Sequence, residues 1–229
     1  IPGSHMVSNA LAGIAVGYAF GMSDEQIARG IEANVPIQGR SNLIETGKYT
    51  VIDDCYNANP ASVKASLDVL SCADTRTVAI LGDMFELGEH SEKMHYDTGA
   101  HAADAGIDVL VCIGSLSADT ARGAEETAQK KGLPMEVVHY ASKEEFFGQA
   151  DSLLKERDTI LVKASHAMDF SRIVDWLEKR DHRAHETGSD RDPGSRKDCC
   201  PGQRPPDQRS RPAGQSSPDG PLRRIYALL

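Results

Sequence analysis

Residues 51–67 read VIDDCYNANPASVKASL, in which an apolar run ends at two acids and a polar loop leads into a helical pattern. Asn59 stands where a helix N-cap is expected, because its side chain can accept a hydrogen bond from the first helical turn. Pro60 suits the first position of the helix. The stretch therefore predicts a β-strand, a polar loop and an α-helix in direct succession.

Similar apolar runs recur along the chain as YTVID, TVAILG, DVLVCIG, MEVVHY and TILVKAS. Val, Ile and Leu occupy both faces of these runs, and helical patterns separate them, such as the one that begins with a capping box from Ser142 to Glu145. This alternation predicts a mostly parallel sheet that is covered on both sides. We expect a Rossmann-like α/β domain over residues 43–180. No GxGxxG motif follows the first strand, which disfavours a dinucleotide cofactor.

The two ends of the chain differ from this middle part. The strings HMVSNALAGIAVGYAFG and SDEQIARGIEA predict two helices, the second with a capping box from Ser23 to Gln26 and apolar positions at Ile27 and Ile31. Because no strand accompanies them, we expect residues 1–42 to be the end of a preceding domain. Residues 181–229 hold most of the 11 prolines and few apolar residues, which predicts a disordered tail. A Pro-rich docking segment is the alternative for that tail.

Charge and composition exclude several classes of partner. The formal net charge is −9, and the acidic excess lies within residues 1–180, so the chain is not expected to bind nucleic acid. No apolar run approaches the length of a membrane span, and we expect a cytoplasmic protein without a membrane partner. Cys55, Cys72 and Cys112 lack metal-binding spacing and are predicted to be buried free thiols.

Several separated strings share an order and spacing with a known family. PGSHMVSNALAGIAVG, the Gly39–Arg40 pair, VIDDCYNANPASVKASL, AILGDMFELGE and ILVKASHAMDFSRIV resemble the C-terminal part of the Mur ligase family, over roughly residues 1–179. The resemblance implies an enzyme with an N-terminal UDP-sugar-binding domain, a central ATPase domain and a C-terminal Rossmann-like domain. It also implies amide formation through an acyl phosphate, with ATP and Mg²⁺.

Within the family, DDCYNANP and LGDMFELGE are most similar to one branch. Its members join D-alanyl-D-alanine to UDP-N-acetylmuramoyl-tripeptide in peptidoglycan precursor synthesis. The phosphate-binding loop GxxxxGK[ST] does not occur in this chain, so we expect the chain alone to be inactive. The resemblance assigns that loop and the magnesium ligands to the missing part of the central ATPase domain, of which residues 1–42 are implied to be the last helices. The N-terminal domain of the same enzyme is implied to be missing as well. Two alternatives remain: a related amide ligase of the folylpolyglutamate or cyanophycin synthetase type, and a non-catalytic Rossmann-like binding module.

Five residues are predicted to contact a nucleotide, three of them because they match positions of the family. Asn9 matches an adenine-contacting Asn, whose amide both donates and accepts, and His5 lies on the same helix face. Arg40 matches a linker arginine that reaches phosphate oxygens. Asp54 matches an acid at the ribose, and Asn57 lies in the same loop. The alternatives are a surface Asn9, a cloning remnant around His5 and a solvated Arg40.

Four residues are predicted to meet the substrate. Lys163 closes the last strand at the carboxyl edge of the sheet, and Ser165 and His166 follow it. The resemblance implies that these three positions face the cleft, where they could bind the carboxylate of the dipeptide. A solvated loop is the alternative for these three. Asn59 is predicted to act first as a helix cap and second as a ligand.

Other notable residues are given structural roles. Asp53 is predicted to be structural, and Phe146, Phe147 and Trp176 have the spacing of core residues. LGDMFELGEH concentrates Asp83, Glu86, Glu89 and His90, but acids are favoured at helix starts by the helix dipole alone. For that cluster we expect a substrate-facing or domain-contact role and no metal. No catalytic residue is predicted in this chain.

Overall fold

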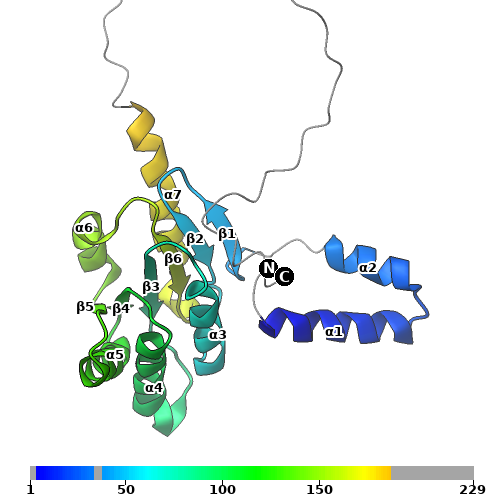
Figure 1. The fold of residues 1–229 in the computed structure, drawn as a ribbon, viewed down its shortest axis with the longest axis horizontal. Coiled ribbons are helices and arrows are strands. Elements are labelled where there is room, and N and C mark those ends of the chain that lie inside the picture. Colours follow the sequence, from blue (N-terminus) through cyan, green and yellow to red (C-terminus); the bar gives the residue numbers. More distant parts are fainter. Residues whose placement is uncertain (1–3, 34–37, 187–229) are drawn as a thin grey trace, which may run out of the picture.

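A computed structural model describes residues 4–33 and 38–186 of the 229-residue chain (Figure 1). Its centre is a six-stranded sheet in the order β1-β2-β6-β3-β4-β5. The first strand is antiparallel to its neighbour and all other neighbours are parallel. The strands are β1 Asn42–Glu45, β2 Thr50–Asp53, β3 Thr77–Gly82, β4 Val109–Ile113, β5 Glu136–Tyr140 and β6 Thr159–Lys163. The predicted α/β class with a mostly parallel sheet is confirmed.

Helices cover both faces of the sheet, so the fold has three layers. One face packs against α3 Pro60–Leu70, α4 Ser91–Asp104 and α5 Ser117–Lys131, and the other against α6 Lys143–Leu153 and α7 Ser171–Glu186. Short 3₁₀ helices, η1 Gly88–His90 and η2 His166–Met168, lie in two of the loops.

Each strand contributes side chains to both layers of core. In β6, Ile160 and Val162 belong to the core under α6 and α7, whereas Leu161 belongs to the core under α3, α4 and α5. A strand buried on both faces needs apolar side chains at every position. This is why the sequence of β6 shows an unbroken apolar run instead of alternation.

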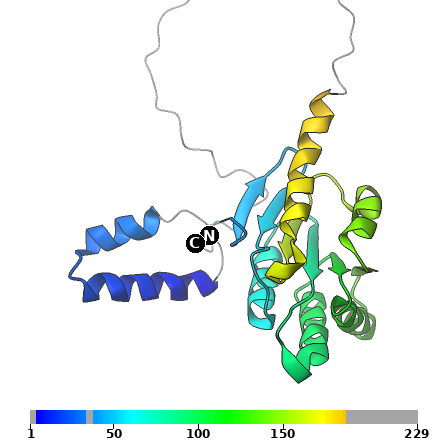
Figure 2. The ribbon, with the colours of Figure 1, turned by 180° about the vertical axis from the view of Figure 1, so that it is seen from behind.

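Two helices precede the sheet: α1 Ser4–Ala19 and α2 Asp24–Glu32. Figures 1 and 2 show the pair to one side of the sheet-containing body. The predicted capping box from Ser23 to Gln26 is confirmed, and Ile27 is buried against α1, where Gly17 leaves room for its side chain. Ile31 differs from the expected apolar pattern, because its side chain is 39% exposed.

Some local predictions are confirmed. Asn59 caps α3, and its Oδ1 accepts a hydrogen bond from the Ser62 N–H (2.9 Å). Phe146 is fully buried, with Phe147 and Trp176 packed around it. Cys55 and Cys112 are buried free thiols, whereas Cys72 is only half-buried.

Three details differ from the sequence-based expectations. Strand β1 was not expected, because only two of its four residues are apolar and it pairs as a short edge hairpin. Ser142 caps α6, but Glu145 accepts from the Ala141 N–H instead of closing the capping box. Helix α7 continues to Glu186, past the predicted boundary at Asp181, and the rest of the predicted tail lies outside the described residues. Within the described residues, no helix is both long and apolar enough to cross a membrane.

Candidate functional site

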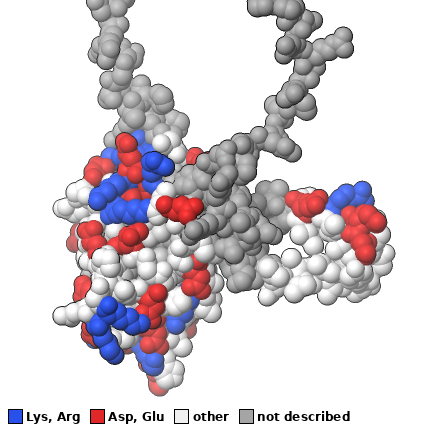
Figure 3. Space-filling model, viewed as in Figure 1, with Lys and Arg blue, Asp and Glu red and all other residues white. Residues whose placement is uncertain are grey.

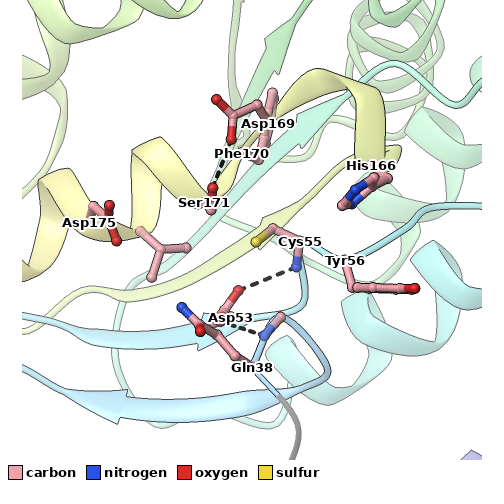
Figure 4. Close-up of a pocket in the computed structure, with 11 residues that line it drawn as sticks. Gln38, Asp53, Cys55, Tyr56, His166, Asp169, Phe170, Ser171 and Asp175 are labelled. Atoms are coloured by element: carbon pink, nitrogen blue, oxygen red, sulfur yellow. Dashed lines mark hydrogen bonds between the residues drawn. The ribbon is translucent and has the colours of Figure 1, made fainter.

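The chain changes sides of the sheet around β6. After β2 and β3 it enters α3 and α4 on one face, whereas after β6, which lies between them, it enters α7 on the opposite face. Loops that part in this way leave a crevice at the carboxyl ends of the strands, where ligands of open α/β sheets bind. A pocket of about 320 Å³ lies there (Figure 4). It is lined by Gln38, Gly39, Asp53, Cys55, Tyr56, His166, Asp169, Phe170, Ser171, Val174 and Asp175.

Tyr56 forms one wall of this pocket. Its ring lies 5.4 Å from that of His166, and the guanidinium carbon of Arg40 lies 4.1 Å from its ring centroid. A guanidinium that stacks through its face keeps its N–H groups, which lie in the plane, free to bind phosphate or carboxylate oxygens. Arg40 and His166 are both exposed. The structure therefore brings two of the predicted ligand residues together around Tyr56.

Asp53 ends β2 beneath the pocket and is only 2% exposed. Its Oδ2 accepts from the Gly39 N–H (2.8 Å) and its Oδ1 from the Cys55 N–H (3.4 Å), so it has the structural role predicted for it (Figure 4). Burial, reinforced by this carboxylate, raises the pKa of the Cys55 thiol far above its ordinary value. Cys55 is therefore not a nucleophile, because only the thiolate attacks.

Asp54 and Lys163 form an ion pair between β2 and β6, with 2.6 Å between Nζ and Oδ2. The Lys163 side chain is 3% exposed and that of Asp54 13%. Lys163 Nζ also donates to the carbonyl of Asn57 (2.9 Å). Asp54 further accepts from the Ser41 N–H (3.0 Å), the Ser41 hydroxyl (3.2 Å) and the Ser66 hydroxyl (2.7 Å). In this conformation both charged groups bind other parts of the protein, and their predicted ligand roles stay predictions.

The remaining predicted substrate residues have different surroundings. Ser165 is 5% exposed, and its hydroxyl accepts from the Phe85 N–H (2.9 Å), which ties the loop after β3 to the loop after β6. His166 lines the pocket. Asn59 is occupied as the cap of α3, and the exposed Asn57 accepts from the next backbone N–H (2.9 Å).

The acidic cluster after β3 is spread over several environments. Asp83 is buried and its Oδ1 accepts from the Ser117 N–H at the start of α5 (2.7 Å). Glu86, Glu89 and His90 are exposed. In the described part of the chain, no three or more His, Cys, Asp or Glu side chains are grouped so that they could hold a metal ion.

Asn9 is not among the residues that line the pocket. Asn9 is exposed on α1, and His5 belongs to the same helix, but its side chain lies outside the described residues. Their predicted contacts with a nucleotide therefore stay predictions.

Sequence reasoning missed several residues of the site. Tyr56 lies inside the polar loop of residues 54–59. An aromatic ring among acids and amides is a signal that could have identified it as a site residue. Ser41 and Ser66 carried no such signal, because they reach Asp54 from segments 13 and 12 positions away. Asp169, Ser171 and Asp175 enter the pocket wall only because α7 starts beside β2.

Comparisons with known proteins agree with this architecture. The family description "Mur ligase, glutamate ligase domain" matches residues 39–166. The UDP-N-acetylmuramoyl-tripeptide–D-alanyl-D-alanine ligase of Bacillus subtilis (strain 168) is 34% identical over 177 residues, and the ligase of that name from Escherichia coli (strain K12) is 32% identical over 184 residues. These matches cover 76% and 78% of this chain.

The chain spans only 38% of the length of each of these two relatives. Among solved structures, MurF from Acinetobacter baumannii has a TM-score of 0.68 at 28% identity, covering 77% of this chain and 38% of that one. The family match begins at Gly39 and ends at His166, so it takes in the whole sheet and the pocket-lining residues Gly39, Asp53, Cys55, Tyr56 and His166. The chain therefore belongs to the Mur ligase family.

Proposed function

We propose that this chain is the C-terminal part of an ATP-dependent ligase that joins D-alanyl-D-alanine to UDP-N-acetylmuramoyl-tripeptide in the cytoplasm. The observation that carries the proposal is the 34% identity, over 76% of the chain, to a ligase of that name. The strings DDCYNANP and LGDMFELGE support the same branch of the family. In the structure, the first of them supplies a wall of the pocket and the second supplies Phe85, which is tied to Ser165.

The proposed reaction forms an amide bond in two steps. The tripeptide carboxylate is first phosphorylated from ATP, and the amine of D-alanyl-D-alanine then attacks the acyl carbon and displaces phosphate. An acyl phosphate is also open to attack by water, so a domain that covers it during the reaction favours the amide product. We assign this covering role to residues 43–180.

Arg40 fits the phosphate part of this proposal. Its guanidinium is exposed, oriented by Tyr56 and able to offer paired donors to phosphate oxygens. The described residues offer no metal-binding group. We therefore assign the Mg²⁺ ligands to another part of the intact enzyme.

The helix pair supports the proposal that residues 1–42 end a preceding domain. A stretch of large apolar side chains on α1, α2 and their connection is left uncovered by the described residues, and in Figure 3 the charged side chains of this helix pair lie along α2, whereas the visible side of α1 carries none. Apolar faces of this kind are normally buried against a partner surface. The exposed side chains are Val7, Leu11, Val16, Tyr18, Phe20, Met22 and Ile31.

An assay of the full-length gene product tests the proposed function. Purified enzyme is given ATP, Mg²⁺ and UDP-N-acetylmuramoyl-tripeptide, with D-alanyl-D-alanine, glutamate or aspartate as the amine. We expect ADP release and a ligated product that depend on D-alanyl-D-alanine. A product formed with glutamate or aspartate and not with the dipeptide would reassign the chain to a related amide ligase.

A further inference from the structure

Two adjacent carboxylates hold the backbone on both sides of Arg40. The Gly39 N–H, immediately before Arg40, donates to Asp53 Oδ2 (2.8 Å), and the Ser41 N–H, immediately after it, donates to Asp54 Oδ1 (3.0 Å). The Gly39 carbonyl accepts in turn from the Tyr56 N–H (2.9 Å). Hydrogen bonds to a charged acceptor are stronger than those between neutral groups. The segment that carries Arg40 is therefore attached to the end of β2 at both of its neighbouring residues.

The backbone at Ser41 needs this attachment because a left-handed conformation is unfavourable for a residue with a side chain. Gly39 has φ +75° and Ser41 has φ +52°, so both neighbours of Arg40 are left-handed. A side chain at Gly39 would place its Cβ 3.2 Å from the Tyr56 backbone nitrogen, so only glycine fits there without a shift of the loop. Strained residues of this kind persist only where the surroundings hold them.

Lys163 holds the second carboxylate in place. Asp53 and Asp54 are neighbours, and their negative charges repel unless a cation offsets them. Lys163 lies 2.6 Å from Asp54 at the end of β6 and is 3% exposed. Lys163 thus contacts Asp54, and Asp54 contacts the backbone of Ser41, the residue next to Arg40.

We propose that Asp53, Asp54 and Lys163 are positioning residues that fix the left-handed backbone around Arg40 and so hold its guanidinium over the ring of Tyr56, a residue of the pocket wall. Asp53 and Asp54 accept from the backbone N–H groups on either side of Arg40, and Lys163 pairs with Asp54, so all three act on Arg40. The role of Arg40 toward a phosphate rests on the proposed function, but the attachment of its backbone does not.

Limited digestion with trypsin tests the attachment directly, because trypsin cleaves after Arg40. In Asp54→Ala, we expect cleavage after Arg40 to be roughly 10-fold faster, the change that corresponds to losing one hydrogen bond to a charged acceptor. Asp54→Asn keeps an acceptor and should fall between Asp54→Ala and the wild type. Gly39→Ala strains the same segment without touching the buried pair, and it should also accelerate the cut.

Asp158→Asn is the matched control. The Asp158 side chain is 1% exposed and forms an ion pair with Arg76 (2.9 Å). The two residues directly precede β6 and β3, so they lie at the amino ends of the parallel strands, away from Asp53 and Asp54. We expect trypsin to cleave Asp158→Asn after Arg40 at the same rate as the wild type. Equal acceleration in Asp158→Asn would mean general loosening of the domain, and no acceleration in Asp54→Ala and Gly39→Ala would mean that the carboxylates do not hold the segment. Either result overturns the proposal.

Kinetics of the full-length gene product test the consequence for activity. Arg40→Ala should lower kcat for dipeptide-dependent ATP turnover on the order of 100-fold, as loss of a charge-stabilising donor does. Asp54→Ala should lower it roughly 10-fold, and the double variant should be no worse than Arg40→Ala, because Asp54 acts through Arg40. If the fold loss of kcat in the double variant equals the product of the two single-variant losses, Asp54 acts independently of Arg40 and the positioning role is overturned. Absence of any D-alanyl-D-alanine-dependent turnover in the wild type would instead contradict the proposed function, while the digestion result would still stand.

Discussion

The ammonium group of Lys163 is buried at the carboxyl end of β6, an inner strand of the sheet. Asp54 and the Asn57 carbonyl accept its hydrogen bonds. Such a group costs free energy to bury, and its carboxylate partner recovers that cost only while both are present. The single residue thus joins the last strand to the loop after β2.

Removing the Lys163 ammonium should expose this dependence. We expect Lys163→Met to lower the free energy of unfolding by about 3 kcal/mol, because Asp54 is left as an uncompensated, largely buried charge. The double variant Lys163→Met/Asp54→Asn should recover part of that loss. Urea denaturation followed by the fluorescence of Trp176, the single tryptophan, measures both values. A double variant less stable than Lys163→Met would contradict the explanation by an unpaired charge.

Helices α4 and α5 approach each other closely because each has a glycine at the contact. A Cβ added at Gly99 would overlap the carbonyl of Thr120, and one at Gly123 would overlap that of Tyr96. Both obstacles are backbone atoms, which cannot move aside as the end of a side chain could. The distance between the two helices is therefore set by the absence of these two side chains.

Gly99→Ala should destabilise the domain by about 3 kcal/mol, the upper end of typical overpacking costs. Gly148→Ala in α6 is the matched control, because a Cβ there meets nothing within 4 Å and the residue is exposed. That change should stabilise the chain by about 0.5–1 kcal/mol through helix propensity. Thermal unfolding measured by circular dichroism distinguishes the two signs. If both variants shift the midpoint upward, the proposed close contact is absent.

The two cores of the molecule each contain a buried thiol: Cys55 on the side of α6 and α7, and Cys112 on the side of α3, α4 and α5. Burial is the main cause that raises the pKa of both thiols, and nearby carboxylates add to it. The folded chain therefore keeps two protons that the unfolded chain releases in mildly alkaline solution. This links the stability of the whole domain to pH.

Because the pKa of both thiols is raised in the folded chain, the free energy of unfolding falls as the pH rises. Below the ordinary thiol pKa of about 8.5 the contribution to stability is complete, and above it stability falls as the unfolded thiols ionise. The loss should reach about 1.4 kcal/mol per pH unit for each thiol. Urea denaturation between pH 7 and about 9.5 measures the slope, which should be shallower in Cys55→Ala/Cys112→Ala. An identical slope in that variant would show that other groups cause the dependence.

The chain by itself should bind ATP very weakly, because the phosphate-binding loop is not in its sequence. Calorimetric titration of the chain with ATP and Mg²⁺ should therefore give little heat, whereas the full-length gene product should bind measurably. Tight binding by the chain alone would favour the non-catalytic binding module over the ligase.

Apart from β1, the succession of strands and helices along the chain, the cap at Asn59 and the two-sided burial of the sheet followed from the sequence, because each depends on residues within one turn or one strand of each other. The resemblance to the Mur ligases was also readable, since it rests on strings of consecutive residues. The contacts of Asp54, by contrast, join Ser41, Ser66 and Lys163 from three separate segments. No local pattern in the sequence predicts that Lys163 pairs with Asp54 inside the protein, or that the Arg40 guanidinium stacks on the ring of Tyr56. The ion pair between Lys163 and Asp54 arises only when β6 inserts between β2 and β3, because that crossover brings the ends of the two strands together.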